Sequence, residues 1–377
     1  MNRLLRGTVN LPGSKSESNR ALMIAAYGGF PCEASQLSEA HDTMLLKALL
    51  EQTSVCSGIV DCEDAGTVAR FLLTYLSFRP GTWLLTGSPR LCERPLTPLV
   101  DALRQLGADI AGDRLPLRIV GRPLQGGRVT LDGSQSSQFA SSLLMAAPTW
   151  ECGLQLDLTG RPVSMPYLEM TLAMMRHFGV RSEWEGNTIT VAHQAYKPSP
   201  FDVSADWSAA SYWYEMLALS EGGGNLLLKG LKADSLQGDA VVAEWFRPLG
   251  IETVFDPRGA RITKPSRALT DLPQGLVFDF TDVPDLFPAV YATCAALGVE
   301  ADFRGTDTLA DKESDRVKAM ETEMARVGEH GVLCTHGDHR IAMSLAALWP
   351  LKGPVELDDP SVVDKSYPGF WKDLDLL

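Results

Sequence analysis

Basic side chains recur at the start of segments whose later residues are small and mostly apolar. Lys15 and Arg20 precede the apolar run 21–26, and Arg70 and Arg340 hold similar places in two later segments. A helix N-terminus carries unpaired N–H groups and about half a positive charge, so it attracts anions. Arginine pairs with carboxylate or phosphate through two donors, and lysine supplies a mobile charge or a proton. The pattern predicts a small ligand with several negative charges.

Other side chains could complete such a site. The further basic candidates are Arg94, Lys312, Arg316 and Lys365, and Ser136, Ser137 and Ser164 could donate to phosphate oxygens. Asp285 follows a proline at a predicted helix start, and Glu313 lies between two basic residues, so both carboxylates could move protons. A serine or aspartate at one helix start is more often a cap than a ligand. It is the repeated combination that indicates a binding site.

Several other functions fit the sequence poorly. Residues 13–16, Gly-Ser-Lys-Ser, resemble the end of a phosphate-binding loop, but Thr8 stands where that motif needs a glycine. No Gly-x-Gly-x-x-Gly opens a predicted helix and no His/Cys cluster has zinc-ligand spacing, so the sequence gives little support to a dinucleotide site or a metal site. The net charge of −13 argues against a nucleic-acid or anionic-membrane partner.

Two kinds of helix alternate along the chain and must position these residues. Six segments are apolar nearly all round, which is typical of buried helices: 14–27, 65–78, 134–147, 206–220, 282–297 and 338–349. Six others are amphipathic, the last two more weakly: 95–106, 167–178, 237–249, 313–327, 42–51 and 368–377. Strand-like runs and glycines separate them. The alternation favours an α/β fold of repeated units over an ordinary doubly wound sheet.

Cysteine usage and hydropathy bear on the compartment. The seven cysteines are scattered, with no Cys-x-x-Cys pair, as expected of reduced thiols. Residues 1–10 lack the apolar stretch of a secretory signal, and no run of about 18 apolar residues could span a membrane. We therefore expect a cytoplasmic protein without a membrane partner.

Nine ordered motifs resemble one known family, the 5-enolpyruvylshikimate-3-phosphate synthases. In chain order they are LPGSKSESNRALMIAA, DAGTVAR, ERPLTPLVDALRQLGA, DGSQSSQF, VSMPY, VPD, KESDR, GDHRIAM and DKSYPGF. The resemblance runs from Leu11 to Phe370, nearly the whole chain. Nine motifs in the right order are far more specific than any one of them.

The resemblance implies an architecture of two inside-out α/β domains, each of three repeated βα units with buried central helices. The N-terminal domain would span residues 14–204. The C-terminal domain would combine residues 1–13 with 205–377, and the active site would lie in the cleft between the domains. The family also implies a monomer that needs no cofactor and no metal.

The reaction implied by the resemblance moves the enolpyruvyl group of phosphoenolpyruvate to the 5-hydroxyl of shikimate 3-phosphate, releasing phosphate by addition and elimination. Asp285, Glu313 and Lys15 would be catalytic. Shikimate 3-phosphate would contact Lys15, Ser16, Arg20, Ser136, Ser137, Gln138, Ser164, Tyr167, Asp285 and Lys312. Phosphoenolpyruvate would contact Lys15, Gly66, Arg94, Gln138, Arg316, Arg340 and Lys365.

Three places in the chain depart from the family pattern. Asp64 stands where asparagine is common, and Phe71 replaces a usual proline. Ala310 and Asp311 stand before Lys312 where the family has Arg-Val, which makes the local charge more negative. An extra carboxylate at Asp64 would repel phosphoenolpyruvate unless it points away or pairs with Arg70. These departures keep a non-catalytic, anion-binding relative open as an alternative. A second alternative is the related transferase acting on UDP-N-acetylglucosamine, whose reactive cysteine would correspond to Cys92.

Overall fold

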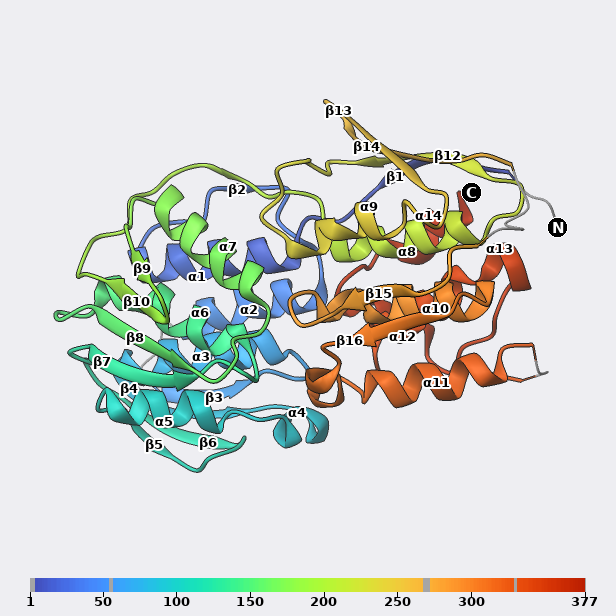
Figure 1. Cartoon of the computed structure of the whole chain (residues 1–377). Helices are drawn as coiled ribbons and strands as arrows, with labels where there is room; N and C mark the ends of the chain where they lie inside the picture. Colours follow the sequence, from blue (N-terminus) through green and yellow to red (C-terminus); the bar gives the residue numbers. More distant parts are fainter. Residues whose placement is uncertain (1–3, 54–56, 267–271, 329–330, 377) are drawn as a thin grey trace. The chain divides into compact units, whose positions relative to one another are not determined.

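The computed structural model describes residues 4–53, 57–266, 272–328 and 331–376 (Figure 1). The chain divides into two compact units. The N-terminal unit comprises Lys15–Ser38 and Asp42–Val203, and the C-terminal unit comprises Met1–Ser14, Glu39–His41 and Ser204–Leu377. Each unit has an apolar core of its own.

The N-terminal unit buries three helices: α1 (Lys15–Gly28), α3 (Gly66–Phe78) and α6 (Ser137–Ala146). Its other helices are α2 (His41–Gln52), α4 (Pro89–Glu93), α5 (Thr97–Gln105), η1 (Ala147–Thr149) and α7 (Met165–His177). Its strands are β2 (Ala34–Ser35), β3 (Ser57–Asp61), β4 (Gly81–Thr86), β5 (Asp109–Ala111), β6 (Leu117–Gly121), β7 (Gly127–Asp132), β8 (Leu154–Thr159), β9 (Glu183–Glu185), β10 (Thr188–Val191) and β11 (Phe201–Asp202).

The C-terminal unit buries α8 (Trp207–Leu219), α10 (Phe287–Leu297) and α12 (His339–Ala347). Its other helical segments are η2 (Gly238–Val241), α9 (Val242–Trp245), η3 (Pro284–Leu286), η4 (Asp307–Asp311), α11 (Arg316–Arg326), α13 (Trp349–Lys352), η5 (Pro360–Lys365) and α14 (Phe370–Asp375). Its strands are β1 (Leu5–Asn10), β12 (Gly224–Lys229), β13 (Glu252–Asp256), β14 (Gly259–Lys264), β15 (Leu276–Asp279) and β16 (Ala301–Arg304).

Three four-stranded sheets share one topology. Their strand orders are β3-β4-β6-β5, β7-β8-β10-β9 and β1-β12-β14-β13. In each, the first two strands are parallel and the last two form an antiparallel hairpin beside them. The same pattern three times supports the repeat interpretation and confirms the α/β class.

The apolar pattern of the sequence predicted the buried helices correctly. All thirteen residues of α8 are buried, as an all-round apolar segment predicts. Four of the predicted helix-ending glycines, Gly107, Gly179, Gly250 and Gly328, have positive φ, which a residue without Cβ adopts easily.

Two helix predictions were wrong in extent. The segment 237–249 forms only η2 and the four-residue α9, and it begins with the buried Gln237, whose side chain bonds to α8. The segment 282–297 begins with a 3-10 turn, η3, before α10, since Pro288 lacks the N–H of a regular helix turn. The structure also has a short helix, α4, that periodicity did not predict.

Among the residues that the structure describes, no helix is both long and apolar enough to cross a membrane.

Candidate active site

The C-terminal unit gathers three acidic side chains around one buried guanidinium. Arg316 begins α11 and is 1% exposed. Its Nε lies 2.8 Å from Asp338 Oδ2, its Nη1 lies 2.8 Å from Asp285 Oδ1, and its Nη2 lies 3.0 Å from Glu313 Oε2. Three carboxylates therefore surround Arg316. Burial alone would lower the pKa of Arg316, but Asp338, Glu313 and Asp285 raise it above its ordinary value.

Asp285 joins two arginines. Its second oxygen, Oδ2, accepts a hydrogen bond from Arg340 Nη2 at 2.7 Å, so each carboxylate oxygen is bound by a different guanidinium. Burial alone would raise the pKa of Asp285, but Arg340, Arg316 and Lys312 together hold it well below its usual range. In this arrangement Asp285 is a firmly ionised carboxylate and a weak proton acceptor.

Two lysines extend the same cluster. Lys365, at the end of η5, places Nζ 3.8 Å from Glu313 Oε1, and Lys312 lies close enough to Asp285 to lower its pKa. The structure thus brings together Asp285, Glu313, Arg316, Arg340, Lys365 and Lys312, as the sequence predicts.

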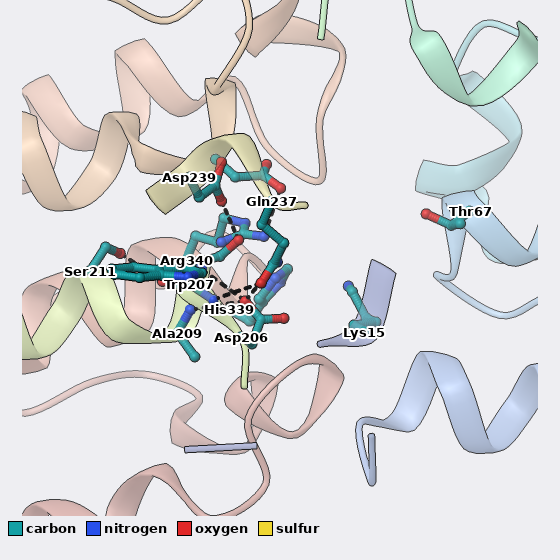
Figure 2. A network of polar contacts seen from close by, with 12 residues as sticks. Lys15, Thr67, Asp206, Trp207, Ala209, Ser211, Gln237, Asp239, His339 and Arg340 are labelled. Atoms are coloured by element: carbon teal, nitrogen blue, oxygen red, sulfur yellow. Dashed lines mark hydrogen bonds and ion pairs between the residues drawn. The ribbon is translucent and has the colours of Figure 1, made fainter. Parts of the chain in front are cut away.

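Sequence reasoning missed a buried polar network at the start of α8 (Figure 2). Asp206 caps α8 and accepts hydrogen bonds from the backbone N–H groups of Ser208 and Ala209. Gln237 bonds both to Asp206 and to the backbone N–H of Trp207. Asp239 is fully buried and accepts a hydrogen bond from the Ser208 hydroxyl, while no hydrogen bond to its Oδ1 is found in the described part of the chain.

Asp239 also interacts electrostatically with two of the candidate residues, Asp285 and Arg340. Burial, followed by repulsion from Asp285, raises the pKa of Asp239 to about 7, and Arg340 opposes this rise. The only sequence signal for this network was the Gln-Gly-Asp run 237–239, which looked like an ordinary amphipathic helix start.

The N-terminal unit also holds a buried arginine. Arg20 of α1 is 2% exposed. Its guanidinium bonds to the hydroxyls of Thr171 and Ser141 and to the carbonyls of Ser16 and Tyr167. Burial lowers the pKa of Arg20 to about 10, which still leaves it charged at neutral pH. The nearby Glu17 carboxylate opposes this lowering, but none of the four hydrogen bonds of Arg20 goes to a carboxylate. A buried cation that donates to neutral acceptors favours an anionic ligand.

Lys15 forms an ion pair that the sequence did not predict. Its Nζ lies 2.8 Å from Asp42 Oδ2, and the Asp42 side chain is only 4% exposed. Asp42 lies in α2, so the packing of α2 beside the start of α1 creates this pair. A negatively charged ligand at Lys15 would compete with Asp42 for the same ammonium group.

Two arginines converge on Gly66, the first residue of α3. A Cβ atom at Gly66 would lie 2.5 Å from Nη1 of Arg70 and 2.5 Å from Nη1 of Arg94. Only a glycine lets both guanidinium groups approach this helix N-terminus so closely. One residue later, the hydroxyl of Thr67 accepts a hydrogen bond from Gln138 Nε2 at 3.0 Å. Gly66, Arg94 and Gln138 therefore lie in one region, as the sequence predicts.

The serine candidates lie at helix starts. Ser136 caps α6 by accepting from the N–H of Gln138, and Ser137 is the buried first residue of that helix. Ser164 precedes α7 with a φ of 55°, an uncommon conformation for serine, and Tyr167 lies in the first turn of α7. The structure thus positions these residues at α6 and α7 of the same unit.

The departures from the family pattern have structural explanations in two of three cases. The Asp64 carboxylate accepts a hydrogen bond from the Ser88 hydroxyl at the start of α4. Phe71 is fully buried, and the Arg20 guanidinium carbon lies 5.7 Å from its ring centre. Nothing in the structure explains Asp311, which is exposed at the end of η4.

In the described ranges no group of three or more His, Cys, Asp or Glu side chains could hold a metal ion. The six cysteines in those ranges are all free, and Cys92 is half-buried with its thiol 3.5 Å from the Gly87 carbonyl.

Comparison with known proteins decides the family. The model of EPSP synthase (3-phosphoshikimate 1-carboxyvinyltransferase) matches residues 33–374. The chain belongs to the EPSP synthase family. A 3-phosphoshikimate 1-carboxyvinyltransferase of Bacteroides fragilis (strain YCH46) is 42% identical, covering 98% of this chain and 95% of the relative. One of Methanoculleus marisnigri is 34% identical, covering 96% and 94%.

Solved structures agree on the fold. EPSP synthase from Acinetobacter baumannii superposes with a TM-score of 0.78 at 22% identity, covering 100% of this chain and 96% of that chain. The predictions of family, α/β class and enzyme type are therefore confirmed. The role of each individual EPSP synthase candidate residue stays a prediction.

Proposed function

We propose that this chain transfers the carboxyvinyl group of phosphoenolpyruvate to the 5-hydroxyl of shikimate 3-phosphate and releases phosphate. Membership of the EPSP synthase family supports the reaction. The observation that carries the proposal is Asp285, which Arg316 and Arg340 bind through one oxygen each. That arrangement combines a candidate base with two cations suited to a carboxylate or phosphate.

The bonds change in two stages. The 5-hydroxyl oxygen attacks C2 of phosphoenolpyruvate, loses its proton to a base, and C3 gains a proton, which gives a tetrahedral intermediate. C3 then loses a proton, the C2–phosphate oxygen bond breaks, and phosphate leaves. We assign the hydroxyl proton to Asp285 and the C3 proton to Glu313 or Lys15.

Binding of the donor would change the state of Asp285. If the carboxylate or phosphate of phosphoenolpyruvate takes over Arg316 and Arg340, Asp285 loses two stabilising hydrogen bonds. Its pKa would then rise toward the ordinary range, and it would become a better proton acceptor. The basic residues would also stabilise negative charge that shifts during addition and elimination.

The proposal assigns substrate contacts to both units. Lys15, Ser16, Arg20, Gly66, Arg94, Ser136, Ser137, Gln138, Ser164 and Tyr167 belong to the N-terminal unit, and the cluster around Arg316 belongs to the C-terminal unit. It requires both sets to contact one pair of substrates, and it includes a monomeric, cytoplasmic enzyme.

A phosphate-release assay tests the reaction. We expect release only when phosphoenolpyruvate and shikimate 3-phosphate are both present. Binding of shikimate 3-phosphate without release would favour a non-catalytic, anion-binding relative. Release with UDP-N-acetylglucosamine as the acceptor, together with inactivation by alkylation of Cys92, would favour the related transferase.

A further inference from the structure

The guanidinium of Arg20 is almost saturated by neutral acceptors. An arginine has five N–H donors. Four are used: Nε bonds to Thr171 Oγ1 at 2.7 Å, Nη1 to the Ser16 carbonyl at 3.0 Å, and Nη2 to Ser141 Oγ at 3.4 Å and the Tyr167 carbonyl at 3.1 Å. One N–H of Nη1 is left. No carboxylate accepts a hydrogen bond from Arg20 within the described ranges of the chain.

The bond to Thr171 is the shortest of the four, and the Thr171 hydroxyl also contacts two of the other acceptors. Thr171 lies in the second turn of α7 and is fully buried. While it accepts from Arg20, its own hydroxyl lies 2.9 Å from Ser141 Oγ and 2.9 Å from the Tyr167 carbonyl, so its single proton goes to one of them. One hydroxyl thereby connects α1, α6 and α7.

Two aromatic rings restrict the guanidinium further. Its central carbon lies 5.7 Å from the ring centre of Phe71 in α3 and 6.0 Å from that of Tyr167. These contacts favour the cation but leave it able to rotate in its own plane. The Nε–Thr171 bond, at 2.7 Å the shortest of the four, restricts this rotation together with the longer Nη1 and Nη2 bonds.

We propose that Thr171 is a positioning residue for binding of the acidic acceptor, acting through Arg20. Its hydroxyl helps to fix the guanidinium plane so that the remaining Nη1–H faces the ligand. This inference rests on the proposed function, which makes shikimate 3-phosphate that ligand. Without the Thr171 oxygen, Nε–H is buried without an acceptor, and Arg20 must move to satisfy it.

The chain offers a matched control in Thr293 of α10. Both threonines are fully buried within a helix and bond to the carbonyl four residues earlier, Thr171 to Tyr167 at 2.9 Å and Thr293 to Ala289 at 2.7 Å. Only Thr171 also accepts from an arginine. A valine at either position removes the hydroxyl with little change in volume.

Titration calorimetry with shikimate 3-phosphate tests the proposal. We expect Thr171→Val to raise its Kd about ten-fold, as loss of one charged hydrogen bond predicts. Thr171→Ser should restore the wild-type value, and Thr293→Val should leave it unchanged. The KM for phosphoenolpyruvate should not change in any of them. An unchanged Kd in Thr171→Val, or an equal rise in Thr293→Val, overturns the proposal.

A double-mutant comparison shows whether Thr171 acts through Arg20. Arg20→Lys should weaken binding, and adding Thr171→Val to it should weaken binding no further. Independent, multiplicative effects would contradict the proposal. If Thr171→Val does not fold, Thr171→Cys supplies the comparison, since a thiol is a weaker acceptor. Wild-type protein that neither binds shikimate 3-phosphate nor releases phosphate overturns the proposed function itself.

Discussion

Asp338 Oδ2 lies 2.8 Å from Arg316 Nε, and the two side chains are among the least exposed in the C-terminal unit. Asp338 also caps α12 by accepting from the N–H of Arg340. One carboxylate therefore fixes both the start of a buried helix and the central guanidinium of the candidate site. Its charge and its capping role can be separated by substitution.

Asp338→Asn should lower the free energy of unfolding by roughly 3 kcal/mol, because asparagine caps a helix well but leaves Arg316 short of one buried counter-charge. Urea unfolding measures the change. Asp315→Asn is the control, since Asp315 caps α11 but is partly exposed, and it should change stability by less than about 1 kcal/mol. Equal losses in both variants would contradict a special contribution of the buried Asp338–Arg316 pair, since asparagine keeps both caps.

Lys15→Met should abolish nearly all turnover and also lower stability by about 2 kcal/mol, because Asp42 loses its ammonium partner in a buried position. Steady-state kinetics and thermal unfolding measure the two effects. Lys15→Met combined with Asp42→Asn should regain stability but not turnover. Ordinary activity in Lys15→Met would remove Lys15 from the site.

Glu313→Gln should slow the single-turnover rate roughly 100-fold or more while changing the Kd of phosphoenolpyruvate only a few-fold. The amide keeps the size of the side chain but cannot take up a proton as a carboxylate does. Rapid-quench measurement on the loaded enzyme separates chemistry from binding. A single-turnover rate equal to that of the wild type would show that Glu313 does not transfer a proton.

Gly66→Ala should raise the KM of phosphoenolpyruvate about ten-fold, because its Cβ would displace the guanidinium groups of Arg70 and Arg94. The melting temperature should hold, since Gly66 does not have a positive φ and alanine favours helix. Gly58→Ala, which meets no atom within 4 Å, is the matched control. Loss of affinity in both variants would make the effect unspecific.

Asp239→Asn should change how stability depends on pH. Asp239 has a folded-state pKa of about 7, above its ordinary value of 3.8, so the folded protein retains this proton longer than the unfolded chain. Its contribution to stability therefore decreases as pH rises from about 4 to about 7 and is constant above that.

Urea unfolding at pH 5, 6, 7 and 8 measures this difference. As pH rises to about 7, the free energy of unfolding of the asparagine variant should increase relative to that of the wild type. The increase should be at most about 1.4 kcal/mol per pH unit. Curves that run parallel throughout this range would contradict the assignment.

The sequence predicted the buried helices because each is apolar on every side, and this signal is local. It also predicted most candidate residues, since they cluster at helix starts or match family motifs. It could not predict that Lys15 pairs with Asp42, or that Arg316 meets three carboxylates. Those partners depend on how helices pack, and residues such as Asp338 looked like ordinary caps.

The segment beginning at Gln237 shows a different failure. Its apolar residues follow helical spacing, but Gln237 and Asp239 turn inward to bond with the start of α8. Those side-chain bonds compete with a regular helix, which shrinks to η2 and α9. A pattern of apolar spacing contains no information about such bonds.

Arg20 receives its surroundings from α1, α3, α6 and α7, which are spread over some 150 residues of chain. A nascent or truncated polypeptide that lacks α7 contains Arg20 but lacks its hydrogen-bond acceptors Thr171 and Tyr167. Recognition of the ligand is therefore available only after the unit is complete. In the cell, bound ligand would stabilise complete molecules and would not stabilise incomplete ones.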